Sequence, residues 1–126
     1  MTRNRCILII DDEEDIREVT QLTLELEGGW DVLTASSGME GIALAERERP
    51  DAILLDVMMP DMDGIATIGG LKDNPQTRSI PVLFLTAKGQ SDALEEWLEL
   101  GVTATISKPF NPLQLVSQIR QILRWN

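Results

Sequence analysis

The chain of 126 residues is 43% apolar and 25% charged, which fits one globular domain over residues 1–126 and argues against a disordered segment. Its net charge of −10 disfavours a strong DNA-binding surface on this chain, and no apolar run approaches the roughly 20 residues that span a bilayer. The chain has one cysteine, which excludes an internal disulfide and fits a reducing cytoplasm. It has no histidine, so the usual general base is absent and too few ligands remain for a structural zinc site.

The first half of the chain predicts two strand–helix pairs and a third strand. Residues 7–10 are continuously apolar and end on Asp11, as expected of a buried strand, and the run is too short for a signal peptide. A helix over 14–27 is stopped by Gly28-Gly29 and has an apolar stripe made of Ile16, Val19, Leu22 and Leu26. A strand over 31–35 is followed by a Ser36-Ser37-Gly38 cap and a helix that carries Met39, Ile42 and Ala43. Residues 52–55 form a second buried run, which ends on Asp56.

The second half repeats this alternation. A helix is predicted over 64–72, although Gly69 and Gly70 each weaken it by about 1 kcal/mol relative to alanine. Residues 82–85 form a strand that ends on Thr86, and a helix over 92–100 is closed by a glycine. The β-branched run 103–106 favours a strand, with Lys108 just past its end. The apolar stripe of a final helix consists of Leu113, Val116, Ile119 and Ile122.

Strands that alternate with helices predict an α/β fold, a doubly wound parallel sheet with helices on both faces. In such folds the ligand site lies beyond the carboxyl ends of the strands, where the strand order reverses. Every polar residue that closes a predicted strand should therefore lie at one edge of the sheet: Asp11, Asp12, Asp56, Thr86 and Lys108.

This set of side chains has a defined chemistry. Three carboxylates held close together repel one another unless a cation is present, and oxygen ligands without histidine or cysteine indicate Mg²⁺ or Mn²⁺. With the metal bound, one carboxylate can attack phosphorus and form an aspartyl phosphate. Lys108 can neutralise the added charge, and the Thr86 hydroxyl can bond a phosphoryl oxygen.

Each residue also has a structural interpretation. Asp11 or Asp12 can simply cap the next helix, Thr86 is a β-former, a single lysine is usually solvated, and an acidic composition keeps a domain in solution. The convergence of all of them favours the functional interpretation, because structural accident would have to supply each polar strand end independently.

Four segments resemble the receiver domains of bacterial two-component response regulators, over roughly residues 5–124. They are Ile-Ile-Asp-Asp-Glu-Glu at 9–14, Leu-Leu-Asp-Val-Met-Met-Pro-Asp-Met-Asp-Gly at 54–64, Phe-Leu-Thr-Ala-Lys at 84–88 and Ser-Lys-Pro-Phe at 107–110. Any one segment is weak, but all four in this order are specific. The resemblance implies a five-stranded flavodoxin-like sheet of order 2-1-3-4-5, with no enzymatic turnover beyond the domain's own phosphorylation and dephosphorylation.

The resemblance also implies a role for each matching residue. Asp56 is expected to be the phospho-acceptor for a sensor histidine kinase or phosphotransfer protein. Asp12 would be a direct Mg²⁺ ligand, Asp11 a ligand acting through water, and the Met58 carbonyl the remaining protein ligand. Thr86 would be the switch hydroxyl and Lys108 the phosphate partner. The bond before Pro109 would be cis, and Pro60 and Gly64 would shape the loop after Asp56.

Three positions vary from, or within, the receiver pattern. Receivers often carry an aromatic residue three positions before the lysine, where this chain has Thr105, so the usual partner of Thr86 is absent. Met58 and Lys88 lie near the approach path of the hydrolytic water, and we expect Met58 to obstruct that path.

Trp97 has two interpretations, core packing or an anchor on an exposed partner face, whereas Trp30 and Trp125 are expected to pack.

Two other functions compete. A magnesium-dependent phosphatase or phosphomutase needs a second carboxylate two residues after its nucleophile, where this chain has Met58. A flavodoxin-type cofactor binder needs a Ser/Thr/Gly-rich loop after the first strand, where this chain has an acidic one. Only two residues follow Arg124, which favours a stand-alone receiver over a piece of a longer regulator. We expect this receiver to be a monomer or to dimerise on phosphorylation. It would act on an unknown downstream protein and would bind neither nucleic acid nor membrane.

Overall fold

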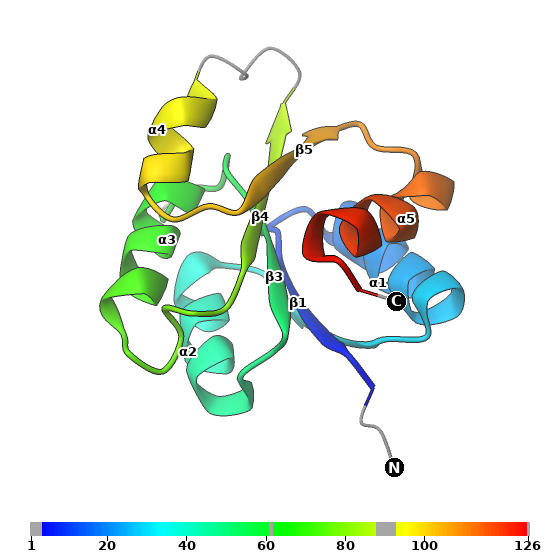
Figure 1. The fold of residues 1–126 in the computed structure, drawn as a ribbon, viewed down its shortest axis with the longest axis horizontal. Coiled ribbons are helices and arrows are strands. Elements are labelled where there is room, and N and C mark those ends of the chain that lie inside the picture. Colours follow the sequence, from blue (N-terminus) through cyan, green and yellow to red (C-terminus); the bar gives the residue numbers. More distant parts are fainter. Residues whose placement is uncertain (1–3, 61, 88–92, 126) are drawn as a thin grey trace.

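The computed structural model describes residues 4–60, 62–87 and 93–125. Within these residues strands and helices alternate (Figure 1). The strands are β1 Cys6–Ile10, β2 Asp31–Ala35, β3 Ala52–Asp56, β4 Val82–Ala87 and β5 Ala104–Lys108. The helices are α1 Glu14–Gly28, α2 Gly38–Glu48, α3 Gly64–Asp73, α4 Leu94–Glu99 and α5 Pro112–Leu123.

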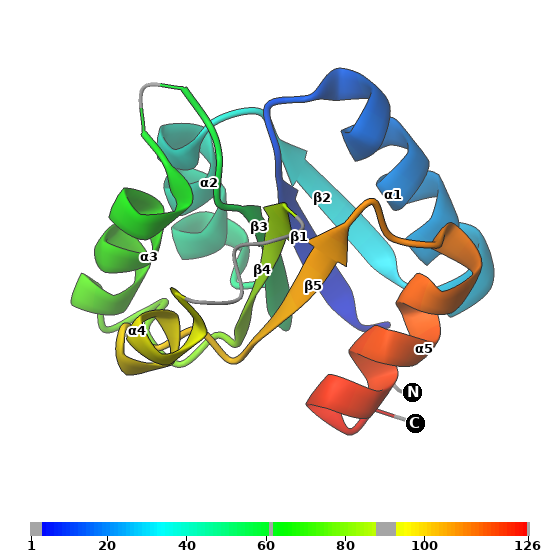
Figure 2. The same cartoon turned by 90° about the horizontal axis from the view of Figure 1, so that it is seen from above.

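The strands form one parallel sheet in the order β2-β1-β3-β4-β5, which confirms the predicted doubly wound fold. Helices α1 and α5 cover one face, and α2, α3 and α4 cover the other (Figures 1 and 2). The strand order reverses between β1 and β3, so the carboxyl ends of these two strands flank the switch point of the sheet.

Two apolar cores lie on opposite faces of the sheet, as the alternation of side chains along a strand requires. In β4, Phe84 packs under α4, whereas Leu83 and Leu85 belong to the core under α1 and α5. Residues 7–10 are fully buried because both faces of β1 are covered. This explains why β1, β3 and β4 appear in the sequence as continuous apolar runs, whereas the edge strands β2 and β5 contain polar residues.

Local signals place most helix ends where the sequence predicts them. Ser37 caps α2 by accepting a hydrogen bond from the backbone N–H of Glu40 at 3.2 Å. Gly29 ends α1 in the left-handed conformation with φ of 67°, which glycine adopts without strain. Gly70 in α3 makes room for α2, because a Cβ there would lie 2.7 Å from Cδ1 of Ile42.

The predicted packing face of α1 is largely wrong. Val19, Leu22 and Leu26 are 50%, 57% and 74% exposed, and the buried residues of the helix are Thr20 and Leu24. Two overlapping stripes of this helix are compatible with helical spacing, and the direction from which the sheet and α5 approach selects one of them. The same correction applies to Leu113 of α5 and to Met39 and Ala43 of α2, which are exposed.

Element ends differ from the prediction by one or two residues. Strands β3 and β4 extend over the polar residues Asp56 and Thr86, because ladder pairing continues past the apolar run. Helix α4 is described from Leu94, and the predicted start at Asp92 lies outside the described residues.

The tryptophans are packing residues. Trp97 of α4 is 4% exposed and meets Phe84 edge to face at 5.2 Å between ring centroids. Its alternative interpretation, an anchor on an exposed face, is therefore wrong. Trp30 and Trp125 meet edge to face at 5.2 Å between ring centroids. The guanidinium group of Arg5 lies over the Trp125 ring, and that of Arg120 lies over the Trp30 ring.

Candidate functional site

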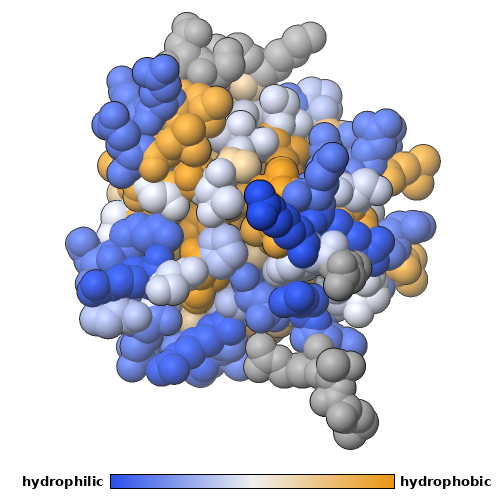
Figure 3. All heavy atoms as spheres, viewed as in Figure 1, coloured by the Kyte–Doolittle hydropathy of each residue, from blue (hydrophilic) through white to orange (hydrophobic). Residues whose placement is uncertain are grey.

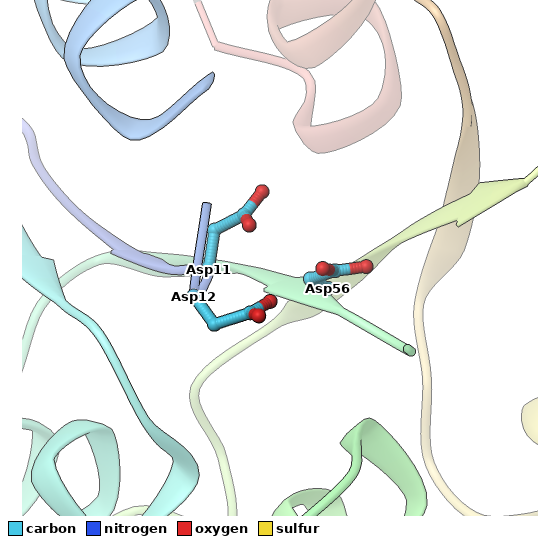
Figure 4. Close-up of side chains that lie close together, drawn as sticks. All are labelled: Asp11, Asp12 and Asp56. Carbon is cyan, nitrogen blue, oxygen red and sulfur yellow. The ribbon is translucent and has the colours of Figure 1, made fainter. Parts of the chain in front are cut away.

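The structure brings the predicted site residues to the carboxyl edge of the sheet. Asp11 directly follows β1, Asp56 ends β3, Thr86 is near the end of β4, and Lys108 ends β5. Figure 4 shows the carboxylates of Asp11, Asp12 and Asp56 gathered at the ends of β1 and β3. One oxygen from each lies within 4.8 Å of the others, a spacing that a single hard cation can bridge.

Asp11 is part of the start of α1 without being its cap. The cap position is Glu13, which makes no side-chain capping bond. Oδ1 of Asp11 accepts a hydrogen bond from the backbone N–H of Glu13 at 2.9 Å. Its other oxygen faces Lys108, so the fully buried Asp11 serves both the helix start and the acidic cluster.

Lys108 is the cation of the site rather than a solvated lysine. Its Nζ lies 3.0 Å from Oδ2 of Asp11, 3.3 Å from Oδ2 of Asp56 and 3.8 Å from Oε1 of Glu13, and its side chain is 16% exposed. Burial acts to lower the pKa of Lys108, but the hydrogen bonds and negative charges of Asp11 and Asp56 outweigh it, so the pKa is raised. The amine therefore stays charged at neutral pH.

Asp56 is a buried carboxyl group, 3% exposed, with an unusual proton affinity. Burial is the largest influence and raises its pKa from 3.8 to about 6. Lys108 opposes this shift, Asp11 adds to it, and the hydrogen bond from the Met58 N–H at 3.2 Å opposes it. A positive charge added beside Asp56 would lower its pKa again and would stabilise the ionised form.

The remaining predicted residues border this cluster. Thr86 is 5% exposed and pairs with Ser107 of β5. It directly follows Leu85, the residue of β4 that pairs with Asp56. Met58 has its side chain 65% exposed. Lys88 lies outside the described residues.

The loop after Asp56 is held close to β3 by Gly64. The Gly64 N–H donates to the Val57 carbonyl at 2.9 Å, and a Cβ on Gly64 would lie 2.7 Å from Cα of Val57 and 2.9 Å from the Asp56 carbonyl oxygen. Pro60 accepts a hydrogen bond from the backbone of Met62. The Lys108-Pro109 bond is cis, as the resemblance implies.

Sequence reasoning missed a pocket of about 510 Å³ that opens beside Asp56 and Lys108. It lies between α1 and the segment after β5, and Ile16, Val19, Thr20 and Phe110 are among its lining residues. The available signal was the spacing of residues 16, 20 and 24, which places Thr20 on the inner face of α1.

Comparison with known proteins gives a consistent family. The family model "Response regulator receiver domain" matches residues 7–120. The alkaline phosphatase synthesis transcriptional regulatory protein PhoP of Bacillus subtilis is 43% identical over 121 residues, covering 96% of this chain and 49% of that protein. The phosphate regulon transcriptional regulatory protein PhoB of Pseudomonas aeruginosa is 40% identical over 120 residues, covering 95% of this chain and 52% of that protein. The chain thus spans about half the length of these two relatives.

Solved structures agree with the sequence relatives. The chemotaxis protein CheY4 of Vibrio cholerae superposes with a TM-score of 0.88 at 32% identity, covering 95% of this chain and 99% of that one. Receiver domains are phospho-acceptor signalling domains, which bind Mg²⁺ in an acidic pocket and are phosphorylated on an aspartate by histidine kinases or phosphotransfer proteins. The matched family model, the sequence relatives and the shared fold show that this chain belongs to the response regulator receiver domain family.

Proposed function

We propose that Asp56 is the phospho-acceptor of this receiver domain. The observation that carries this assignment is a single carboxyl group that ends β3, is nearly buried, and lies 3.3 Å from the Lys108 amine and within 4.8 Å of the Asp11 and Asp12 carboxylates. One Asp56 oxygen attacks the phosphorus of a phosphohistidine, the P–O bond forms, and the P–N bond breaks in line with it. The product is an aspartyl phosphate.

Mg²⁺, or Mn²⁺, fits the donor set of this site. All the side-chain donors are carboxylate oxygens, and Lys108 supplies one positive charge against the three negative charges of the cluster. Asp11, Asp12 and Asp56 would hold the ion together with the backbone carbonyl of Met58. When bound, the ion supplies the positive charge that neutralises phosphoryl oxygens.

Lys108 and Thr86 complete the site on the side of β4 and β5. Lys108 bridges Asp11 and Asp56, which supports the proposal that its amine pairs with a phosphoryl oxygen after the transfer. Thr86 lies on β4, the strand beside Asp56. Its hydroxyl would act as the switch group by forming a hydrogen bond with another phosphoryl oxygen. Thr105 of β5, which pairs with Phe84 of β4, leaves this switch without its usual aromatic partner.

The domain acts as a switch and not as an enzyme with turnover. The residue two positions after Asp56 is Met58, so the site lacks the second carboxylate that an aspartyl-nucleophile phosphatase uses as acid and base. Its only catalysed steps would be its own phosphorylation and dephosphorylation. Multiple turnover of a phosphomonoester by the purified chain would contradict this assignment.

The proposed partners are a sensor histidine kinase or phosphotransfer protein and an unknown downstream protein. Residues 1–126 would act as one cytoplasmic receiver domain, as a monomer or a phosphorylation-linked dimer. The net charge of −10 argues against DNA binding by this part of the protein. No helix among the described residues has the length and apolar character needed to cross a membrane.

The downstream protein has an apolar patch on α4 available to it. Figure 3 shows apolar atoms exposed in the region of α4, on a face that has other apolar areas as well. Leu94 and Leu98 of α4 are 36% and 47% exposed, and Leu100, just after the helix, is 43% exposed.

Incubation with Mg²⁺ and acetyl phosphate tests the acceptor. Mass spectrometry of the intact protein should show one added phosphoryl group, lost in Asp56→Ala and in the presence of a chelator. Asp73→Ala, an exposed aspartate at the end of α3, is the matched control and should keep the label. A label that persists in Asp56→Ala would remove the assignment.

A further inference from the structure

The Arg17 guanidinium binds the backbone beside the acidic cluster. Its Nη1 donates a hydrogen bond to the carbonyl oxygen of Asp11 at 2.8 Å. Acidic side chains surround this half-buried arginine in the sequence, at Glu13, Glu14, Asp15 and Glu18. Within the part of the chain that the structure describes, Arg17 forms no ion pair with any of them. The guanidinium is therefore used on a neutral carbonyl oxygen and not on a carboxylate.

The stability of α1 does not account for this arginine. The N-terminus of a helix carries a partial positive charge, so a cation in its first turns is unfavourable. The groups that lack partners at a helix start are N–H donors, and arginine has no acceptor to offer them. Asp11 precedes the N-cap residue Glu13, so the bonded carbonyl lies outside the helix. The contact acts on the turn between β1 and α1.

The Asp11 carbonyl belongs to the peptide group that joins Asp11 to Asp12. A peptide group is planar, so the direction of its carbonyl fixes the direction in which the Asp12 Cα leaves it. The Asp11 carboxylate has anchors of its own, since its oxygens contact the Glu13 N–H and the Lys108 amine. Asp12 is exposed, and no hydrogen bond from the described residues holds its carboxylate. The direction of the Asp12 side chain thus depends on the peptide group that Arg17 holds.

We propose that Arg17 is a positioning residue for the Mg²⁺ site, because it holds the peptide group from which the Asp12 carboxylate reaches Asp11 and Asp56. This role rests on the proposed function, in which these three carboxylates hold the ion. Groups that orient a metal ligand from outside the coordination shell are worth roughly 10–100-fold in metal affinity. Arg17 bonds the backbone of the ligands and not a carboxylate, so we expect the lower end, about tenfold.

Charge and position predict opposite effects of Arg17 on the affinity for Mg²⁺. A cation near the site repels the ion, so removal of the Arg17 charge by itself would tighten binding. Removal of the hydrogen bond would free the peptide group and weaken binding. A loss of affinity in a neutral variant therefore reports the positional role. The loss should persist at high ionic strength, where charge effects are screened.

Two neutral variants test the role of Arg17. Arg17→Met and Arg17→Gln both remove the charge and the contact, one with an apolar and one with a polar side chain. The unfolding midpoint is measured while Mg²⁺ is titrated, because an ion that binds the folded state raises the midpoint according to its Kd. Both variants should show a Kd about tenfold higher than the unaltered chain.

Arg47→Gln is the matched control. Arg47 lies in the last turn of α2, away from the carboxyl edge of the sheet, and its side chain is 70% exposed. The substitution removes the same charge without touching the turn after β1. Its Kd for Mg²⁺ should stay close to that of the unaltered chain.

The Mg²⁺ dependence of phosphorylation separates positioning from general damage to the fold. The initial rate of Asp56 labelling by acetyl phosphate is measured by mass spectrometry as Mg²⁺ is varied. The Mg²⁺ concentration at half-maximal rate should rise about tenfold in both variants, whereas the maximal rate should stay within about twofold. A fold damaged by the substitution would lose maximal rate instead.

A Kd for Mg²⁺ that is unchanged or lower in either Arg17 variant would overturn the positioning role. A lower maximal rate with an unchanged half-maximal Mg²⁺ concentration would overturn it as well. Labelling of Asp56 at saturating Mg²⁺ in the same proteins would leave the acceptor assignment intact. Failure of the unaltered chain to take label at any Mg²⁺ concentration would instead remove the proposed function itself.

Discussion

Replacement of Asp56 by asparagine should stabilise the metal-free protein at neutral pH. Asparagine keeps the shape of the side chain and an oxygen that can accept the Met58 N–H, but it removes a buried negative charge from a cluster that also contains Asp11 and Asp12. The pKa of Asp56 is raised from 3.8 to about 6. At about 1.4 kcal/mol per pH unit this corresponds to about 3 kcal/mol, and relaxation of the site reduces the expected gain to about 2 kcal/mol.

The gain has a defined pH dependence. A carboxyl group whose pKa is raised on folding stabilises the folded protein most when it is protonated, and this contribution is lost as pH rises from about 4 to about 6. The difference in unfolding free energy between Asp56→Asn and the unaltered chain should therefore be large at pH 7 and should shrink below pH 4. Taking the difference cancels the other titrating groups, which the two proteins share.

Urea denaturation in the presence of a chelator measures the difference, and thermal unfolding should show a midpoint about 6–10 °C higher for the variant at pH 7. Addition of Mg²⁺ should reverse the order of the two proteins. At about a hundred times its Kd the ion adds about 2.7 kcal/mol to the unaltered chain, and less to a variant that lacks one ligand. An Asp56→Asn protein that is no more stable than the unaltered chain in metal-free buffer at pH 7 would refute the burial argument.

Three further substitutions probe the site, and a fourth, Gly69→Ala in α3, is a control. Lys108→Ala should cost about 1–3 kcal/mol of metal-free stability at pH 7, because it leaves the buried carboxylates of Asp11 and Asp56 without their cation, and urea denaturation that shows no loss would contradict this. Gly64→Ala should cost about 1–3 kcal/mol because its Cβ would meet backbone atoms at 2.7 Å and 2.9 Å, whereas Gly69→Ala, with open space around it, should gain up to about 1 kcal/mol in the same assay. Met58→Asn should speed the decay of the phosphorylated protein severalfold by opening the path for water, and an unchanged decay rate measured by mass spectrometry would exclude that role.

The polar residues of the site could be predicted from the sequence because their positions depend on a local pattern. The strands β1 and β3, which are covered on both faces, are continuously apolar, so their runs stop visibly at Asp11 and Asp56. The carboxyl ends of parallel strands share one edge, and this places Asp11, Asp56, Thr86 and Lys108 together without knowledge of any distance. The alternation of strands and helices predicts the doubly wound architecture for the same reason.

The packing face of α1 depended on the tertiary structure. Helical spacing allows a stripe through Val19, Leu22 and Leu26 as well as one through Thr20 and Leu24, and the first contains more apolar side chains. The second is buried because the sheet and α5 approach α1 from that side. A helix by itself carries no information about the direction of its neighbours.

The electrostatics and the pocket also required the folded molecule. The pKa of Asp56 depends on burial and on a lysine 52 positions later in the chain, and the contact of Glu13 with Lys108 depends on how β5 lies relative to the start of α1. The pocket beside Asp56 is made by α1 and the segment after β5, which are distant in sequence. Local pattern therefore determined which residues close the strands, whereas distances between distant segments, on which charge interactions and cavities depend, were decided only by the tertiary structure.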